Sequence, residues 1–329
     1  MDGAIIPSAG AQLTTSGRLD YRLFAEWEKF IDASPRTVEA YTANVRRFAD
    51  YISAQGITAP TRDTVLAYKQ HLQATYKATT VSAYLAAVRV FFQWTDTLPP
   101  PQHYPNIAAH VKGAKISREH KRDDLTAGEC AAVLRRINRN TEQGARDYAI
   151  LTVMITCGLR DIEISRANVE DVARRGEKVR LYVQGKGREE RTDYVNLPQE
   201  AVSAIREYMQ LRTNAAGRSI EGSAPLFASL AHNNHGGRMT TRAVSGIAKR
   251  SLQAAGFDDT RITAHSLRHA AVSNALRGGE DIRAVQMFAR HSDIATTLIY
   301  AHDLDRESNT VSDTLARLIF REGGEARNP

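Results

Sequence analysis

The chain of 329 residues carries, in its second half, side chains that can bind a phosphate group and attack it. They are two arginines, a lysine, two histidines and a tyrosine: Arg160, Lys186, His265, Arg268, His291 and Tyr300. Arginine binds two phosphate oxygens at once through parallel hydrogen bonds, and lysine acts as a point charge. Phosphoryl transfer depends mainly on such positioning and charge, and a tyrosine hydroxyl can serve as the nucleophile. Together these residues predict transfer of a phosphodiester to Tyr300.

Each feature taken alone also has a structural explanation. Lys186 lies in a Gly-Lys-Gly segment that is typical of a tight turn. His265 and Arg268 share one face of a helix, and such a pair is common on a solvated surface. Tyr300 ends an apolar run, which is typical of half-buried packing. Only the combination in this order indicates a site.

No nucleotide or metal is expected to take part in this chemistry. The sequence has no Walker loop, no His-Glu-x-x-His motif and no cluster of metal-binding carboxylates. A covalent phosphotyrosine keeps the energy of the phosphodiester, so the strand can be rejoined without ATP. We therefore expect neither a cofactor nor a metal.

A largely helical scaffold with one β-hairpin is predicted to hold these residues. Residues 179–184 and 191–197 alternate in hydrophobicity and flank Gly185-Lys186-Gly187, which predicts a hairpin with Lys186 at its tip. Lys178 is a rival lysine, but it precedes the first strand and fits the turn less well. Thr126 and Glu129 have the spacing of a capping box. Helices are predicted at 126–138, 143–157, 198–213, 240–255, 265–277, 280–289 and 308–320.

The first part of the chain predicts a separate all-α domain. A first helix carries Leu23, Phe24, Trp27, Phe30 and Ile31 on one face, and Ser34 followed by Pro35 predicts the start of a second. Apolar residues of the second helix recur at helical spacing: Val38, Tyr41, Val45, Phe48 and Ile52. Two more helices are predicted at 62–74 and 79–94. The expected fold class is thus mainly α with a small β-sheet, in two domains.

A proline-rich stop and a basic segment separate the two parts. Three consecutive prolines, residues 99–101, cannot continue a helix. The basic segment carries Lys112, Lys115, Arg118, Lys121 and Arg122. It is either a solvated tether or a strap along a phosphate backbone. The expected divisions are a flexible lead (1–18), a helical domain (19–111), a linker (112–123), a catalytic domain (124–307) and a C-terminal helix with tail (308–329).

The composition favours a globular protein of the cytosol and is compatible with a polyanionic partner. Lys and Arg number 44 against 37 Asp and Glu, a net charge of +7, which alone does not separate nucleic-acid-binding proteins from others. No run of apolar residues is long enough to span a bilayer, and residues 1–17 lack the order of a signal peptide. Two cysteines, Cys130 and Cys157, cannot build a disulfide framework.

The order of arginine, hairpin lysine, His-x-x-Arg, histidine and tyrosine resembles the tyrosine site-specific recombinases, which include phage-type, Xer-type and transposon integrases. The resemblance covers roughly residues 20–320 and implies an all-α core-binding domain followed by a mixed α/β catalytic domain. It implies that Arg160 and Arg268 grip the scissile phosphate and that Tyr300 attacks it. Lys186 would protonate the leaving 5′-oxygen, and His265 would assist proton transfer at the nucleophile. His291 would hydrogen-bond the phosphate, and Glu163 would support the site without reacting.

One position departs from the family pattern. The family commonly has glycine immediately before the second histidine, whereas this chain has Arg290 before His291. A side chain therefore occupies a place where glycine often allows close approach of the backbone. The side chain of Arg290 could itself reach a phosphate.

The resemblance also implies partners. It predicts binding to double-stranded DNA with inverted-repeat core sites. The protein would be a monomer in solution and a tetramer on DNA, and an accessory excision factor is a possible further partner. In the helical domain, the candidate DNA contacts are Arg36, Lys77, Thr79, Thr80 and Arg89, for which a solvated polar face is the alternative. The helix at 308–320 would dock on a neighbouring protomer, or fold back on its own core. A type IB topoisomerase and a non-catalytic DNA-binding regulator are the two rival functions.

Overall fold

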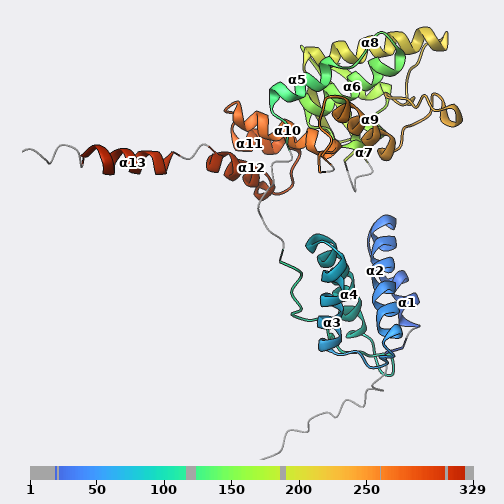
Figure 1. The fold of residues 1–329 in the computed structure, drawn as a ribbon. Helices are drawn as coiled ribbons and strands as arrows, with labels where there is room; N and C mark the ends of the chain where they lie inside the picture. The colour runs from blue at the N-terminus through green and yellow to red at the C-terminus, as the bar shows by residue number, and fades with distance from the viewer. Residues whose placement is uncertain are drawn as a thin grey trace, which may run out of the picture. The chain divides into compact units, whose positions relative to one another are not determined.

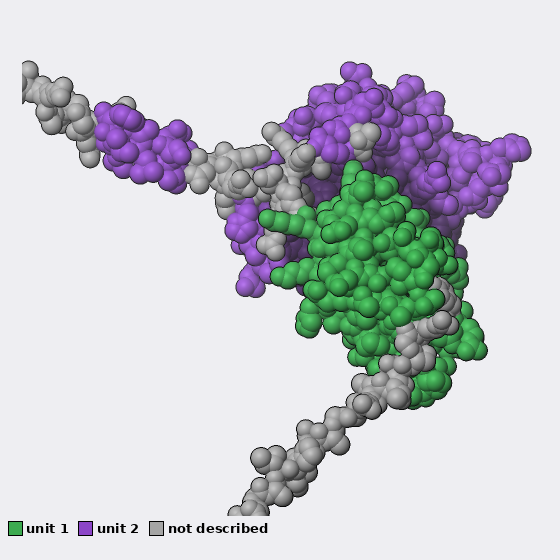
Figure 2. Space-filling view, turned by 60° about the horizontal axis from the view of Figure 1, so that its bottom comes forward, with its two compact units in different colours: residues 1–119 green, residues 120–329 purple. Residues whose placement is uncertain are grey.

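The computed structural model describes residues 19–20, 22–115, 124–185, 190–259, 261–307 and 310–322. The chain divides into two compact units, residues 1–119 and 120–329 (Figure 2). Lys186 and the basic residues Arg118, Lys121 and Arg122 lie outside the described residues. Of the expected linker (112–123), the structure describes residues 112–115 only.

The N-terminal unit consists of helices packed around an aromatic core (Figure 1). Its helices are α1 (Leu23–Phe30), α2 (Pro35–Ala54), α3 (Arg62–Thr75) and α4 (Ala78–Thr95). The Ser34 side chain accepts a hydrogen bond from the Thr37 backbone N–H, and Pro35 occupies the first turn, as predicted. The largest fully buried side chains are aromatic: Trp27, Phe48, Tyr68, Phe91 and Phe92.

The segment that follows α4 belongs to the same core. Tyr104, Ala108, Val111 and Ala114 are buried, and the Tyr104 hydroxyl donates to the Pro60 carbonyl oxygen at 2.7 Å. Lys112 and Lys115 alternate with these buried positions and are exposed. Packing thus holds the described part of the basic segment to the surface of the N-terminal unit.

The C-terminal unit is built around the buried helix α6 (Glu142–Cys157), whose residues 149–151 and 153–154 are fully inaccessible to solvent. The helices α8 and α10 pack against it. The other helices are α5 (Ala127–Arg135), α7 (Asp161–Arg166), α8 (Gln199–Ala216), α9 (Thr241–Ala254), α10 (Ala264–Arg277), α11 (Ile282–Ala289), α12 (Ile294–Glu307) and α13 (Val311–Glu322), with short 3-10 helices at Val169–Asp171 and His232–Asn234.

A small antiparallel sheet completes the C-terminal unit. Its strands are β1 (Val172–Arg175), β2 (Lys178–Val183) and β3 (Asp193–Leu197), in the order β1-β2-β3. The predicted hairpin is present as β2 and β3, with Val179 opposite Leu197 and Val183 opposite Asp193. Lys178 begins β2 and pairs with Arg175. The fold class expected from the sequence is confirmed.

Besides the two short 3-10 helices, three elements were not predicted, namely β1, α7 and α12. The strand β1 has four residues and α7 has six, so neither is long enough to show a period. Tyr300, which ends an apolar run in the sequence, lies inside α12, because the helix continues beyond that run. Within the described parts of the chain, no helix is long and apolar enough to cross a membrane.

Candidate active site

Arg160 stands at the junction between α6 and α7. The chain leaves α6 through Gly158, whose φ of 59° lies in the left-handed region, and Arg160 caps α7. A Cβ atom at Gly158 would lie 3.2 Å from the Phe288 ring, so the position also needs a small residue. The backbone N–H of Arg160 donates to Glu163 Oε2 at 2.8 Å, and its Nη1 donates to Oε1 at 3.1 Å.

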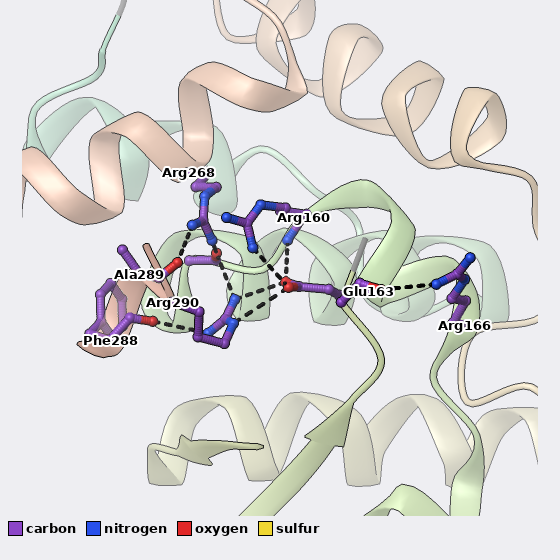
Figure 3. A network of polar contacts seen from close by, with 9 residues as sticks. Arg160, Glu163, Arg166, Arg268, Phe288, Ala289 and Arg290 are labelled. Carbon is purple, nitrogen blue, oxygen red and sulfur yellow. Dashed lines mark hydrogen bonds and ion pairs between the residues drawn. The ribbon is translucent and has the colours of Figure 1, made fainter. Parts of the chain in front are cut away.

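Glu163 binds a second arginine, Arg290 (Figure 3). Arg290 Nη2 lies 2.8 Å from Glu163 Oε2, and Arg290 also donates to the carbonyl oxygens of Phe288 at 3.0 Å and Gly158 at 3.2 Å. The side chain of Arg290 is 9% exposed and that of Glu163 is 1% exposed. Burial opposes ionisation of Glu163, but the charge of Arg290 and the bonds from Arg160 outweigh it and lower the pKa of the carboxyl.

Arg290 ends α11 with an unusual backbone. Its φ of 54° places it in the left-handed conformation, which costs a residue other than glycine roughly 1–3 kcal/mol. This explains why glycine suits the position and why Arg290 departs from the family pattern at an energetic cost. The ion pair with buried Glu163 offsets that cost, and it directs the guanidinium of Arg290 toward the interior of the site.

Arg268 adds a third guanidinium. It lies on α10, is 3% exposed, and donates to the carbonyl oxygens of Gly158 and Ala289. Burial and then the charges of Arg160 and Arg290 lower the pKa of Arg268 to about 9, which leaves it charged at neutral pH. Arg160 and Arg290 pair with Glu163, and Arg268 adds a further positive charge beside them. This excess of positive charge favours binding of an anion.

Tyr300 reaches this cluster from α12. Its hydroxyl is hydrogen-bonded to Nδ1 of His269 on α10, with 5.2 Å between the ring centroids. The ring packs against a small cluster of buried residues formed by Val272, Val285 and Ala289. Burial raises the pKa of Tyr300 to about 12, although the charge of Arg268 opposes that rise.

The two predicted histidines flank this tyrosine region. His291 Nδ1 lies 2.9 Å from Oγ1 of the buried Thr297, and its ring is nearly parallel to that of Tyr300 with 6.4 Å between centroids. Burial and then the charges of Arg268 and Arg160 lower the pKa of His291 to about 4. His265 is exposed and meets the ring of His269 edge-on at 4.4 Å.

The lowered pKa of His291 predicts a pH-dependent stability. The folded protein keeps this ring neutral, whereas the unfolded chain protonates it near its ordinary pKa of 6.5. The free energy of unfolding should therefore lose the contribution of His291 as the pH falls from above 6.5 through about 4. Denaturant titrations at several pH values, with NMR of the histidine rings, measure this pH dependence. His291→Asn keeps a group that can bond Thr297 but cannot titrate, so its free energy of unfolding should lack this dependence. An equal dependence in both proteins would contradict the prediction.

The structure thus brings together Arg160, Glu163, Arg268, His265, His291 and Tyr300. Lys186 lies outside the described residues, although Gly185 before it accepts a hydrogen bond from Arg166 of α7 at 3.1 Å. Sequence reasoning missed His269, the partner of the tyrosine, and Thr297, the partner of His291. For His269 a signal existed, since it lies four residues after His265 and shares its helix face.

The predicted DNA contacts of the N-terminal unit do not all lie together. Arg47 of α2 donates to the Tyr76 hydroxyl at 3.2 Å and stacks on Tyr84, so the start of α4 lies beside this part of α2. Lys77, Thr79 and Thr80 are at that start, whereas Arg36 is roughly 16 Å further back along α2. Arg89 is partly buried, and its Nε has no hydrogen-bond partner.

Comparison with known proteins covers both units. The phage integrase family matches residues 124–307, and the N-terminal SAM-like domain of phage integrases matches residues 28–96. Tyrosine recombinase XerC of Pelobacter propionicus is 31% identical over 294 residues, which are 87% of this chain and 90% of that protein. The chain belongs to the phage integrase family. Tyrosine recombinase XerD of Yersinia pestis is 30% identical and covers 84% of this chain and 91% of its own length.

A solved structure shows the same fold. The XerH site-specific recombinase bound to a palindromic difH substrate superposes with a TM-score of 0.70 at 18% identity, over 84% of this chain and 80% of that chain. The protein is thus a tyrosine recombinase of the integrase family, an enzyme that cuts and rejoins DNA strands at specific sites. The function predicted from the sequence is confirmed, in preference to the topoisomerase and the non-catalytic regulator.

Proposed function

We propose that this integrase forms a 3′-phosphotyrosine link through Tyr300 while Arg160 and Arg268 bind the scissile phosphate. The observation that carries the proposal is the excess of guanidinium groups over carboxylates beside the tyrosine. Arg160 and Arg290 both pair with Glu163, whereas Arg268 donates to backbone carbonyl oxygens. A bound phosphodiester would neutralise that excess. His291 is neutral and oriented by Thr297, so it can hydrogen-bond a phosphate oxygen.

The remaining roles complete a balanced reaction. Tyr300 Oη attacks phosphorus, the bond to the 5′-oxygen breaks, and Lys186 delivers a proton to that oxygen. His265 assists proton transfer at the nucleophile. Glu163 holds Arg160 in place through both its backbone N–H and its guanidinium. Rejoining to a partner duplex reverses these steps and restores free Tyr300.

The substrate is proposed to be double-stranded DNA with inverted-repeat core sites. The XerH protein that shares this fold is bound to a palindromic site in its crystal structure. Exposed Lys77, Thr79, Lys112 and Lys115 of the N-terminal unit would contact phosphates, together with Arg36, Thr80, Arg89 and the basic residues before Asp124. Such a protein would act in the bacterial cytosol, where an accessory excision factor could bias the direction.

Covalent capture tests the proposal. Purified protein is mixed with fragmented DNA from its source, the reaction is quenched in SDS, and the protein-linked fragments are sequenced. One short imperfect inverted repeat should be enriched, and Arg268→Ala should remove that enrichment. Adducts scattered without a common site would instead support topoisomerase-like action. If nicked duplexes, on which rejoining is impossible, also trap no protein, the proposal is wrong.

Assembly into a tetramer is proposed to use α13. This helix exposes an apolar face, with exposed fractions of 51% for Leu315, 63% for Ile319 and 79% for Phe320. A helix of 12 residues is marginal in water without a partner. A pocket of about 280 Å³ between α6, α10 and α11 offers an apolar surface for the α13 of a neighbouring protomer. Its apolar lining consists of Ile155, Ala271, Ala275, Ala284, Val285 and Phe288.

Removal of α13 should separate DNA binding from assembly. A protein that ends before Thr310 is expected to bind a single half-site within about threefold of the full chain, because its DNA contacts lie elsewhere. It should form no synaptic complex and give no recombinant product, because the docking helix is gone. Gel-shift assays and a two-plasmid recombination assay measure the two properties. Unchanged recombination by the shortened protein would exclude an exchange role for α13.

A further inference from the structure

The side chain of His269 lies against the hydroxyl of Tyr300, the proposed nucleophile. A hydrogen bond joins its Nδ1 to the Tyr300 hydroxyl. The two residues come from different helices, α10 and α12, so tertiary packing sets their contact. His269 directly follows Arg268 on α10, the helix that also carries His265.

The chemistry of the imidazole fixes what His269 can do in this contact. A neutral histidine whose Nδ1 accepts a hydrogen bond carries its proton on Nε2. That tautomer leaves Nδ1 as a base, aimed at the phenolic proton. His265 faces the ring of His269 edge-on, with 4.4 Å between centroids. The assistance that His265 gives to proton transfer at the nucleophile therefore acts through His269, whose ring it helps to orient.

The tyrosine needs a base in this position. Burial raises the pKa of Tyr300 to about 12, with Asp124 adding to the rise and Arg268 opposing it. At neutral pH the hydroxyl is therefore protonated, and it must lose its proton as the bond to phosphorus forms. General bases of this kind contribute typically about 100- to 10,000-fold to a rate.

We infer that His269 accepts the proton of Tyr300 during strand cleavage and returns it during rejoining. The inference rests on the proposed function, in which Tyr300 attacks the scissile phosphate. As the Oη–phosphorus bond forms and the bond to the 5′-oxygen breaks, the phenolic proton moves to Nδ1 and creates an imidazolium. The 5′-oxygen takes its proton from elsewhere. In the reverse step the imidazolium protonates the departing Tyr300.

Two substitutions separate proton acceptance from mere orientation. His269→Asn places an amide oxygen near the position of Nδ1, so the hydrogen bond survives while basicity is lost. His269→Ala removes both. The measurement is the single-turnover rate of covalent adduct formation on a nicked duplex, and circular dichroism reports folding. Both variants are expected to react about 100-fold more slowly than wild type or worse. His302→Asn, an exposed histidine on the same helix as Tyr300, is the matched control and should react at the wild-type rate.

The pH dependence gives a second signature. Without its base, the Asn variant depends on the small fraction of phenolate, so its rate should rise about tenfold per pH unit between about pH 7 and 10. The wild-type rate should rise much less over this range. A substrate with sulfur in place of the leaving 5′-oxygen should not rescue His269→Asn, because a thiolate needs no acid to leave but the nucleophile still needs a base.

Each outcome decides the inference. If His269→Asn reacts within about twofold of wild type while His269→Ala is slow, His269 only orients Tyr300 and the inference is wrong. If both variants match wild type, His269 has no part in cleavage. If sulfur substitution restores the Asn variant, the residue acts on the leaving group instead. Absence of any adduct with wild-type protein would overturn the proposed function itself, which is a different result.

Discussion

Replacement of Tyr300 by phenylalanine is expected to abolish covalent attachment of this integrase to DNA. Recombination and adduct formation should fall by more than about 1,000-fold, because no other group can take the place of a removed nucleophile at the same phosphorus. DNA binding should stay within about twofold of wild type. The phenyl ring keeps its packing against Val272, Val285 and Ala289, so the substitution removes only the hydroxyl and its bond to His269.

The measurement is a denaturing gel of protein mixed with a labelled nicked duplex. Tyr194→Phe serves as the matched control, because Tyr194 is an exposed tyrosine on β3 of the same unit. It should form adduct like the wild-type protein. A covalent adduct in Tyr300→Phe would move the nucleophile to another residue, whereas loss of DNA binding in this variant would show that the hydroxyl supports the fold.

The sequence predicted the chemistry of the site better than the contacts between its side chains. Arginine, histidine and tyrosine in a fixed order indicate phosphoryl transfer, and the structure does bring Arg160, Arg268, His291 and Tyr300 together. The order along the chain does not determine which group touches the nucleophile. That depends on how α12 packs on α10, and this packing places His269 against the Tyr300 hydroxyl.

Arg290 shows a second limit of sequence reasoning. The absence of glycine before His291 was visible, and the arginine was expected to be within reach of a phosphate. Its backbone conformation and the position of Glu163, 127 residues earlier, direct it to the buried carboxylate instead. A contact over such a separation is set by the fold. Long, periodic helices such as α2 and α4 were predictable because their apolar stripes carry the information locally.

Replacement of Glu163 by glutamine is expected to destabilise the protein by about 3–5 kcal/mol. The carboxylate is 1% exposed and binds Arg290 and Arg160. Its loss leaves the buried guanidinium of Arg290 without a counter-charge, besides removing the partner of the more exposed Arg160. Denaturant unfolding measures the loss. Glu163 has a lowered pKa, so its contribution is present above about pH 4.5 and is lost as the pH falls through the lower value of the folded state. The glutamine variant should lack this dependence.

Substitutions at Arg290 test whether the ion pair causes that loss. Arg290→Gly removes the pair but relieves the left-handed strain, whereas Arg290→Ala removes the pair and keeps the strain. The alanine variant should therefore be less stable than the glycine variant by about 1 kcal/mol or more. The double variant Glu163→Gln with Arg290→Gly should lose less unfolding free energy than the two single variants lose together. The difference should be about 0.5–3 kcal/mol, as expected for residues in direct contact.

The same imbalance of charge should appear in binding. Without Glu163, Arg160 and Arg290 lose the carboxylate that they share. A DNA phosphate then becomes the main group that can neutralise the arginine cluster. DNA should then raise the melting temperature of Glu163→Gln by more than it raises that of wild type, because a ligand that binds only the folded state stabilises it by an amount that grows with the logarithm of its affinity. Cleavage should nevertheless slow, because glutamine keeps one acceptor oxygen where two hydrogen bonds now orient Arg160. An equal shift in both proteins would mean that Glu163 does not set the charge of the phosphate site.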